Sequence, residues 1–372
     1  MGLSKRRNEL LPRLLSCVVS ATMVLSLMPA PALAEVAQDG AGLEIVEIPD
    51  VSQGEQAISA MSDLRANNGV QYIERTWDAD AKKVMSESKP ATDAQPVPSD
   101  GRMTSGWYYL NSNVKVSNRI YLEGDTHLIL CDGYKLDVKG IYVPKGSTFT
   151  IYGQSDGEDA GMIDSHPSSG AGIGATSDNH PGGNVIIHGG TIKAKGYDHC
   201  AGIGGNDGNE KDIGDFTMYG GTVNATGGSY SAGIGGGQAC EGGKITIYDG
   251  TVTAIGSDCG AGIGGGNGKD HDPFRGGHAG TITIWGGTVT AEGGDEAAGI
   301  GGGEGGNAGK ITINGGTITA TGGNNGAGIG CGEGETTGAG GTVTINGGTV
   351  TATGGDYAAG IGGGYNTDKD YD

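Results

Sequence analysis

The chain has 372 residues, of which 79 are glycine, three are phenylalanine and three are tryptophan. Glycine does not recur at every third position, which excludes a collagen triple helix, and so few large aromatic side chains disfavour an ordinary globular core. The 43 acidic and 23 basic residues give a net charge of −20. Nucleic acid and anionic lipid are therefore not expected partners, because their phosphates would be repelled.

Residues 1–34 have the pattern of a secretory signal peptide. The basic residues Lys5 to Arg7 precede an apolar stretch, Leu14 to Met28, that is too short to span a membrane comfortably. The small residues Ala32 and Ala34 fit the cleavage rule, and we predict cleavage after Ala34. No later segment is long and apolar enough to cross a membrane, so the sequence predicts a secreted protein, either released or associated with the cell surface.

Residues 35–100 form an N-terminal segment ahead of the repeats. Val70 to Thr76 and Lys82 to Met85 are predicted to pair as a β-hairpin across Asp78-Ala79. The proline-containing stretch from Pro90 to Asp100 is predicted to be a linker.

Residues 101–168 contain short segments of alternating apolar side chains, such as Val114 to Val116 and Thr148 to Tyr152, separated by glycine-containing turns. We interpret this region as irregular opening turns of the coil that the later repeats form, because terminal repeats are commonly atypical.

Residues 169–372 hold the regular repeat. The motif Ala-Gly-Ile-Gly begins at Ala171, Ala201, Ala232, Ala261, Ala298, Ala327 and Ala359. Two short Thr-rich strands joined by a glycine corner occur six times, with threonines at Thr191, Thr222, Thr251, Thr288, Thr317 and Thr349. Each of these threonines lies 10 residues before the next motif, whereas the distance from a motif to the next threonine varies from 19 to 27. A fixed path with one variable loop indicates a solenoid.

Alternation within a repeat assigns its faces. Ile311 and Ile313 point to one side and Thr312 to the other, while Ile318 and Ile329 supply two further walls. One turn of about 30 residues cannot bury enough apolar surface alone, so stacked turns must supply the stability. We predict an all-β fold, a right-handed parallel β-helix with three short strands per turn. A β-propeller, the alternative, would need longer antiparallel strands.

Five cysteines remain after the predicted cleavage: Cys131, Cys200, Cys240, Cys259 and Cys331. Their odd number and their spacing fit no metal-ligand pattern. Export permits a disulfide, but nothing in the sequence requires one.

With the repeats in view, the chain resembles a group of exported β-helix repeat proteins of host-associated Gram-positive bacteria. The resemblance is carried by Gly-Gly-Thr-Val-Thr-Ala-Thr-Gly-Gly at 347–355 and Ala-Gly-Ile-Gly-Gly-Gly at 359–364, and it covers about residues 107–372. It implies a pectate-lyase-like fold, and some such proteins bind polysaccharide. Members are often larger surface proteins, so a chain that stops within a repeat at Asp372 is expected to be part of a longer one.

An aromatic stripe precedes the glycine corners. Tyr219, Tyr248 and Trp285 lie on consecutive turns, so their rings are expected to stack about 4.8 Å apart. An exposed row of this kind is suited to lie against sugar rings, and we take these three residues as a candidate site for a polysaccharide or a surface glycan. The alternative is an aromatic ladder that only stabilises the coil.

An acidic stripe lies three residues before the Ala-Gly-Ile-Gly motifs and includes Asp198, Asp258, Asp295 and Asp356. Carboxylates at this spacing repel one another unless a cation lies between them, and calcium prefers oxygen ligands. These residues are therefore candidate calcium ligands, although the known glycine-rich calcium nonapeptide is absent. The alternative is that they are solvated corner residues. Calcium aside, the sequence predicts no cofactor.

Three classes of function remain. The outward strand positions of the regular repeats are mostly threonine, with Lys193 and Lys195 as exceptions, and carry no paired carboxylates. We therefore predict a non-catalytic protein that binds carbohydrate or acts as an adhesin. A polysaccharide lyase or hydrolase and a purely structural surface spacer are the alternatives. The sequence does not predict an oligomeric state.

Overall fold

The computed structural model describes residues 69–176, 180–208, 213–268, 277–334 and 341–366. The predicted signal peptide and its cleavage site at Ala34 lie outside the described residues. In the described part of the chain, no helix has the length and hydropathy needed to cross a bilayer.

The first element is an antiparallel hairpin of β1 (Val70–Asp78) and β2 (Lys83–Ala91). The predicted hairpin is confirmed, but its strands are longer and its turn is residues 79–82. Asp78 ends β1 and its Oδ1 accepts hydrogen bonds from the backbone N–H groups of Asp80 and Ala81. The linker prediction is wrong at its start, because Pro90 belongs to β2. Proline is tolerated there, since β2 is the edge of a two-stranded sheet.

The rest of the described chain is a right-handed parallel β-helix with three walls, as predicted. The first wall consists of β3 (Gln95–Pro96), β4 (Met103–Leu110), β6 (Ile120–Leu130), β9 (Thr148–Gly153), β12 (Asn184–Ile187), β15 (Asp215–Met218), β18 (Lys244–Ile247), β21 (Thr281–Ile284), β24 (Lys310–Ile313) and β27 (Thr342–Ile345). The coil thus begins with β3, inside the predicted linker. That strand pairs in parallel with β4.

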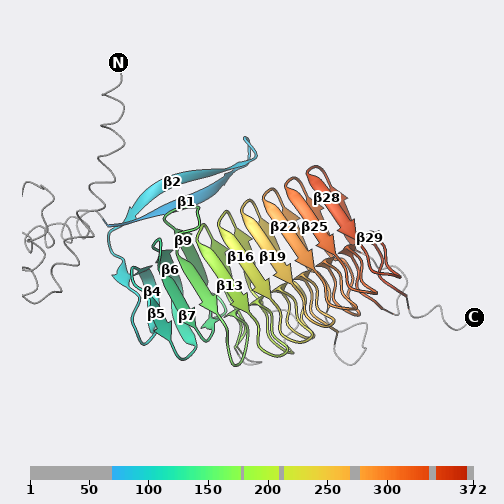
Figure 1. Cartoon of the computed structure of the whole chain (residues 1–372), viewed down its shortest axis with the longest axis horizontal. Coiled ribbons are helices and arrows are strands. Elements are labelled where there is room, and N and C mark those ends of the chain that lie inside the picture. Colours follow the sequence, from blue (N-terminus) through green and yellow to red (C-terminus); the bar gives the residue numbers. More distant parts are fainter. Residues whose placement is uncertain (1–68, 177–179, 209–212, 269–276, 335–340, 367–372) are drawn as a thin grey trace, which may run out of the picture. The chain divides into compact units, whose positions relative to one another are not determined.

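The strands of the second wall lie side by side in Figure 1. They are β5 (Val114–Val116), β7 (Lys135–Val138), β10 (Met162–Ser165), β13 (Thr191–Lys195), β16 (Thr222–Thr226), β19 (Thr251–Ile255), β22 (Thr288–Glu292), β25 (Thr317–Thr321) and β28 (Thr349–Thr353). The third wall consists of β8 (Ile141–Tyr142), β11 (Ile173–Gly174), β14 (Ile203–Gly204), β17 (Ile234–Gly235), β20 (Ile263–Gly264), β23 (Ile300–Gly301), β26 (Ile329–Gly330) and β29 (Ile361–Gly362). The strand β6 links two walls, because its start pairs with β8 and its end with β9.

The core is built of columns in which like residues stack from turn to turn. In the second wall, Val223, Val252 and Val289 are in register and fully buried. Alternate residues point outward, which confirms the predicted period of two. The glycines of the Ala-Gly-Ile-Gly motif let neighbouring turns approach closely. A Cβ atom on Gly264, whose φ is +137°, would lie 1.9 Å from the carbonyl oxygen of Gly301.

Candidate functional site

The aromatic row extends further than the sequence predicted. The rings of Tyr219 and Tyr248 are stacked with centroids 4.8 Å apart and an interplanar angle of 8°, which matches the predicted spacing. The stack continues toward the N-terminus through His188 at 5.0 Å and Tyr152 at a further 4.7 Å, and from there to Trp107 at 5.2 Å. Sequence analysis missed Tyr152 and Trp107 because they lie on the irregular turns, where the repeat spacing is lost.

The C-terminal end of the row is different, because Trp77 of the hairpin joins it. The centroid of the Trp77 ring lies 5.0 Å from that of Tyr248 and 5.0 Å from that of Trp285. The predicted direct stack of Tyr248 on Trp285 is wrong, because among the described residues Trp285 has its ring contact with Trp77 instead. All three side chains are partly exposed. We call these residues the aromatic cluster. Trp77 is far from the other two in the sequence and belongs to no repeat, so no periodicity signals this contact.

Arg75 fixes the hairpin to the coil. Its guanidinium is 6% exposed, donates a hydrogen bond to the carbonyl oxygen of His188 and pairs with Asp156. The backbone N–H of Arg75 also donates to His188 Nδ1 over 3.1 Å. Burial lowers the pKa of His188 to about 4. Gly189 and Gly220 leave room for the arginine, since a Cβ atom on either would meet its side chain within 3 Å.

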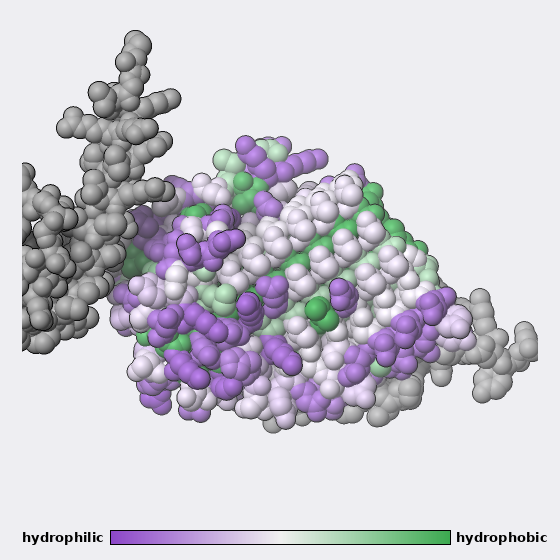
Figure 2. Space-filling model, in the orientation of Figure 1, coloured by the Kyte–Doolittle hydropathy of each residue, from purple (hydrophilic) through white to green (hydrophobic). Residues whose placement is uncertain are grey.

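The outward face of the second wall is lined by threonine over the regular turns. Thr251, Thr288, Thr317 and Thr349 are exposed and in register on neighbouring turns. Each lies three residues after the ring or amide that precedes the glycine corner, so this column of threonines begins one corner after the row. In Figure 2 the face is near white over β19, β22, β25 and β28, and it is purple over β5 and β7.

The purple region contains a charged cluster that sequence analysis did not identify. Asp137 and Asp164 are in register on β7 and β10. One ring nitrogen of His166 lies 3.4 Å from Asp137 and the other lies 3.7 Å from Asp164, which also pairs with Lys135. The prediction that the strands carry no paired carboxylates concerned the regular repeats. The opening turns do carry such a pair, Asp137 and Asp164. The irregular spacing there concealed which residues share a column.

The candidate calcium ligands are not gathered into one site. Asp198, Asp258, Asp295 and Asp356 are all exposed at their corners. Only Asp258 and Asp295 lie on neighbouring turns, since Ser229 and Asn324 occupy the positions between the others. Within the described residues, the metal-ligating groups that do come together are Cys259, Glu296 and Glu304. The first two directly follow the aspartates of the acidic stripe. All five cysteines of the predicted mature chain are thiols, without disulfides.

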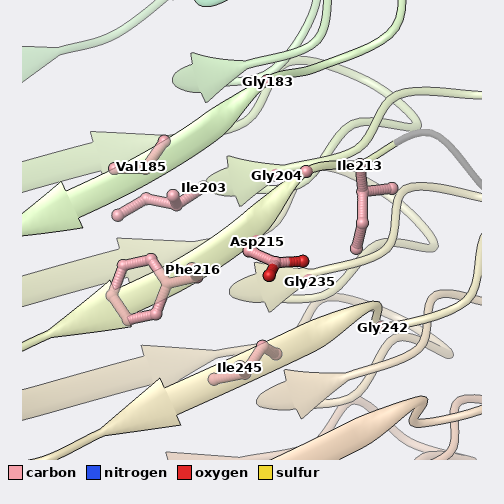
Figure 3. Close-up of a pocket in the computed structure, with 11 residues that line it drawn as sticks. Gly183, Val185, Ile203, Gly204, Ile213, Asp215, Phe216, Gly235, Gly242 and Ile245 are labelled. Carbon is pink, nitrogen blue, oxygen red and sulfur yellow. The ribbon is translucent and has the colours of Figure 1, made fainter. Parts of the chain in front are cut away.

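The coil interior offers no room for a ligand at the hollow drawn in Figure 3. This hollow is lined by Val185, Ile203, Phe216 and Ile245, with Ile213 at its side. Its volume of about 10 Å³ is at the lower limit for a single water molecule. This hollow therefore cannot hold a sugar.

Six segments match the family model described as beta helix repeat: residues 185–207, 216–238, 245–267, 282–304, 311–333 and 343–365. Each segment contains one strand of each wall and leaves out the variable loop. No curated protein and no solved structure matches the chain. The six matches and the three parallel walls together show that the described part of the chain has a β-helix repeat fold.

Proposed function

We propose that the protein is an exported, non-catalytic β-helix protein that binds polysaccharide through the aromatic cluster of Trp77, Tyr248 and Trp285. The observation that carries this proposal is the position of Trp77, which widens the end of the row into three neighbouring, partly exposed rings. Tryptophan and tyrosine combine a large apolar surface with a polar group, which suits them to the apolar faces and hydroxyls of a sugar.

Exposed hydroxyl groups follow two of these rings in the sequence. Thr251 and Thr288 follow Tyr248 and Trp285 across the glycine corner and are exposed. A hydroxyl both donates and accepts hydrogen bonds, as a sugar hydroxyl does, so this column supplies polar contacts along an extended chain. The register repeats from turn to turn, which favours a polymer over a single small sugar.

Tyr219 is assigned a different role. Its ring is stacked between His188 and Tyr248, so both faces are covered and only an edge is directed away from the stack. A sugar ring needs a face that is not closed by a parallel stack. Tyr248 has a parallel stack on one side only, and Trp77 meets Tyr248 and Trp285 at tilts of 30° and 41°. We therefore assign Tyr219 to the stabilising ladder and restrict the binding proposal to the cluster that Trp77 joins.

The proposed absence of catalysis is supported by how the opening-turn carboxylates are engaged. Asp164 is shared between Lys135 and His166, and Asp137 lies against the same imidazole. A catalytic pair needs carboxyl groups that can meet the substrate, and an inverting pair also needs space for water between them. The contacts to Lys135 and His166 engage both carboxylates with neighbouring side chains instead.

The test is a glycan array followed by binding to insoluble polysaccharides. We expect Trp285→Ala and Trp77→Ala each to abolish the signal of the wild-type chain. Tyr357, which is 70% exposed and lies outside the row, provides the matched control Tyr357→Ala, which should bind normally. Unchanged binding by the two tryptophan variants would reject the site. Thermal unfolding of each variant separates lost binding from lost folding.

A rigid surface spacer is the second candidate. It is favoured by the uninterrupted ring stack from Trp107 to Tyr248 and by the continuous aliphatic columns. A chain that binds no glycan on any array while retaining a cooperative unfolding transition would support this candidate. Export is tested separately, by sequencing the N-terminus of the mature protein, which is expected to begin at Glu35.

A further inference from the structure

A group of metal-ligating side chains lies where the corner after the second wall meets the segment after the third wall. The Sγ atom of Cys259 and one carboxylate oxygen from each of Glu296 and Glu304 all lie within 4.8 Å of one another. The Cys259 thiol donates a hydrogen bond to Glu296 Oε2 over 3.0 Å. Each side chain is partly buried, so the group is accessible to an ion without being fully solvated.

The backbone holds these residues together across two turns. The N–H of Glu304 donates to the carbonyl oxygen of Cys259 over 3.0 Å. The carbonyl oxygen of Glu304 accepts from the N–H of Gly268 over 2.9 Å, and that of Glu296 accepts from Glu333 over 2.7 Å. The three ligating groups are therefore placed by the regular coil and are already close together before any ion binds.

A second observation points to a cation at this place. Asn267 occupies the position of Glu304 one turn earlier, directly before Gly268, and is 7% exposed. Its Oδ1 atom is buried and has no hydrogen-bond partner among the described residues. A buried amide oxygen without a donor is unfavourable, so it needs a partner that the protein does not supply. A metal ion is such a partner, since amide oxygens are common metal ligands.

We propose that Cys259, Glu296 and Glu304 bind a divalent transition-metal ion of the zinc type, at the corner where the buried, unpaired amide of Asn267 occupies the equivalent position one turn earlier. A thiolate with two carboxylates suits zinc, whereas calcium takes only oxygen ligands. This site differs from the predicted calcium stripe, which lies one residue earlier at each corner. It is also independent of the aromatic cluster.

The test uses the full mature chain and Co²⁺, whose bond to a thiolate gives a charge-transfer absorption in the near ultraviolet. The wild-type chain is expected to develop this absorption at a single equivalent of Co²⁺ and to lose it when Zn²⁺ is added. Cys259→Ser should lack the band, and Glu296→Gln should weaken binding by at least about tenfold. The controls Cys331→Ser and Glu333→Gln should behave as wild type.

A second measurement keeps the proposal testable if a variant folds poorly. Zn²⁺ is expected to raise the Tm of the wild-type chain and to leave the Tm of Glu304→Gln unchanged, because an ion that binds only the folded state stabilises it. No band in the wild-type chain, or a band that persists in Cys259→Ser, would overturn the site. An equal Tm increase with Ca²⁺ would overturn the transition-metal assignment.

Discussion

The opening turns and the regular turns build the same three walls in different ways. In the opening turns the core is filled by large side chains that differ from one another, such as Met103, Leu128 and Phe149. In the regular turns it is filled mainly by stacked isoleucine, valine and alanine, with Phe216 and Met218 of β15 as the large exceptions. Because the repeat places the same residue at the same position on every turn, glycine stacks on glycine at the corners, and the backbones of neighbouring turns come into contact there. The irregular turns depend on individual packing instead.

The outward faces differ in the same way. The second wall carries Lys115, Lys135, Asp137 and Asp164 over the opening turns and mainly threonine over the regular ones (Figure 2). A repeat copies every outward residue along the coil, so a charge would lie above a like charge on each turn and repel it. Neutral threonine avoids this repulsion. In the irregular turns Asp137 and Asp164 do lie in register, but Lys115, Lys135 and His166 lie next to them.

The largest difference between the two regions is expected in the free energy of unfolding when a glycine is replaced by alanine. Gly264 and Gly106 have nearly the same φ, +137° and +134°. A Cβ atom on Gly264 would meet the backbone of the next turn, whereas one on Gly106 meets nothing within 4 Å. We predict that Gly264→Ala lowers the free energy of unfolding by more than about 3 kcal/mol. Gly106→Ala should cost about 1–2 kcal/mol, from its φ alone.

Chemical denaturation of both glycine variants measures these losses. Equal losses would contradict the idea that close backbone contact distinguishes the regular turns.

His188 tests the junction at which the ring stack passes from Tyr152 of the opening turns to Tyr219 of the regular ones. Burial lowers its pKa to about 4, against about 6.5 for an unfolded histidine. Between these values the unfolded chain binds a proton that the folded chain does not. The folded state is therefore not penalised by His188 above pH 6.5. As the pH falls from 6.5 to 4, protonation of the unfolded chain lowers the free energy of unfolding by on the order of 3 kcal/mol.

The measurement is the free energy of unfolding from pH 4 to 7 for the wild-type chain and for His188→Gln. We expect the variant to show a shallower pH dependence, because carboxylates titrate in both chains and only the histidine differs. Parallel curves would show that His188 is not buried in its neutral form.

The smallest effect is expected at the charged cluster of the opening turns. Asp164 and Lys135 have side chains that are 29% and 42% exposed. Asp164→Asn should therefore lower the free energy of unfolding by no more than about 1 kcal/mol.

The wild-type chain should also not depolymerise a pectin-like substrate in the presence of calcium. Depolymerisation that is lost in Asp164→Asn would assign a catalytic site to the opening turns and overturn the non-catalytic proposal.

Sequence patterns predicted the walls, the core columns and the variable loop, because each follows from alternation and spacing within one turn. They also predicted the stacking of Tyr219 and Tyr248. They did not predict that Trp77 and Arg75 contact the row, because a hairpin outside the repeat has no periodic relation to it. The pairing of Asp137 with Asp164, and of Cys259 with Glu296 and Glu304, was missed because those pairs bridge loops of variable length.

The sequence alone therefore determined the turn and how it stacks. Strand propensity, alternation and glycine corners recur in every repeat, and each turn mainly contacts its neighbours. Only the tertiary structure decided which side chains meet across the corners and where the hairpin lies on the coil. Those contacts join segments that are far apart or not repeated, and their position depends on the three-dimensional path of the chain rather than on any local pattern.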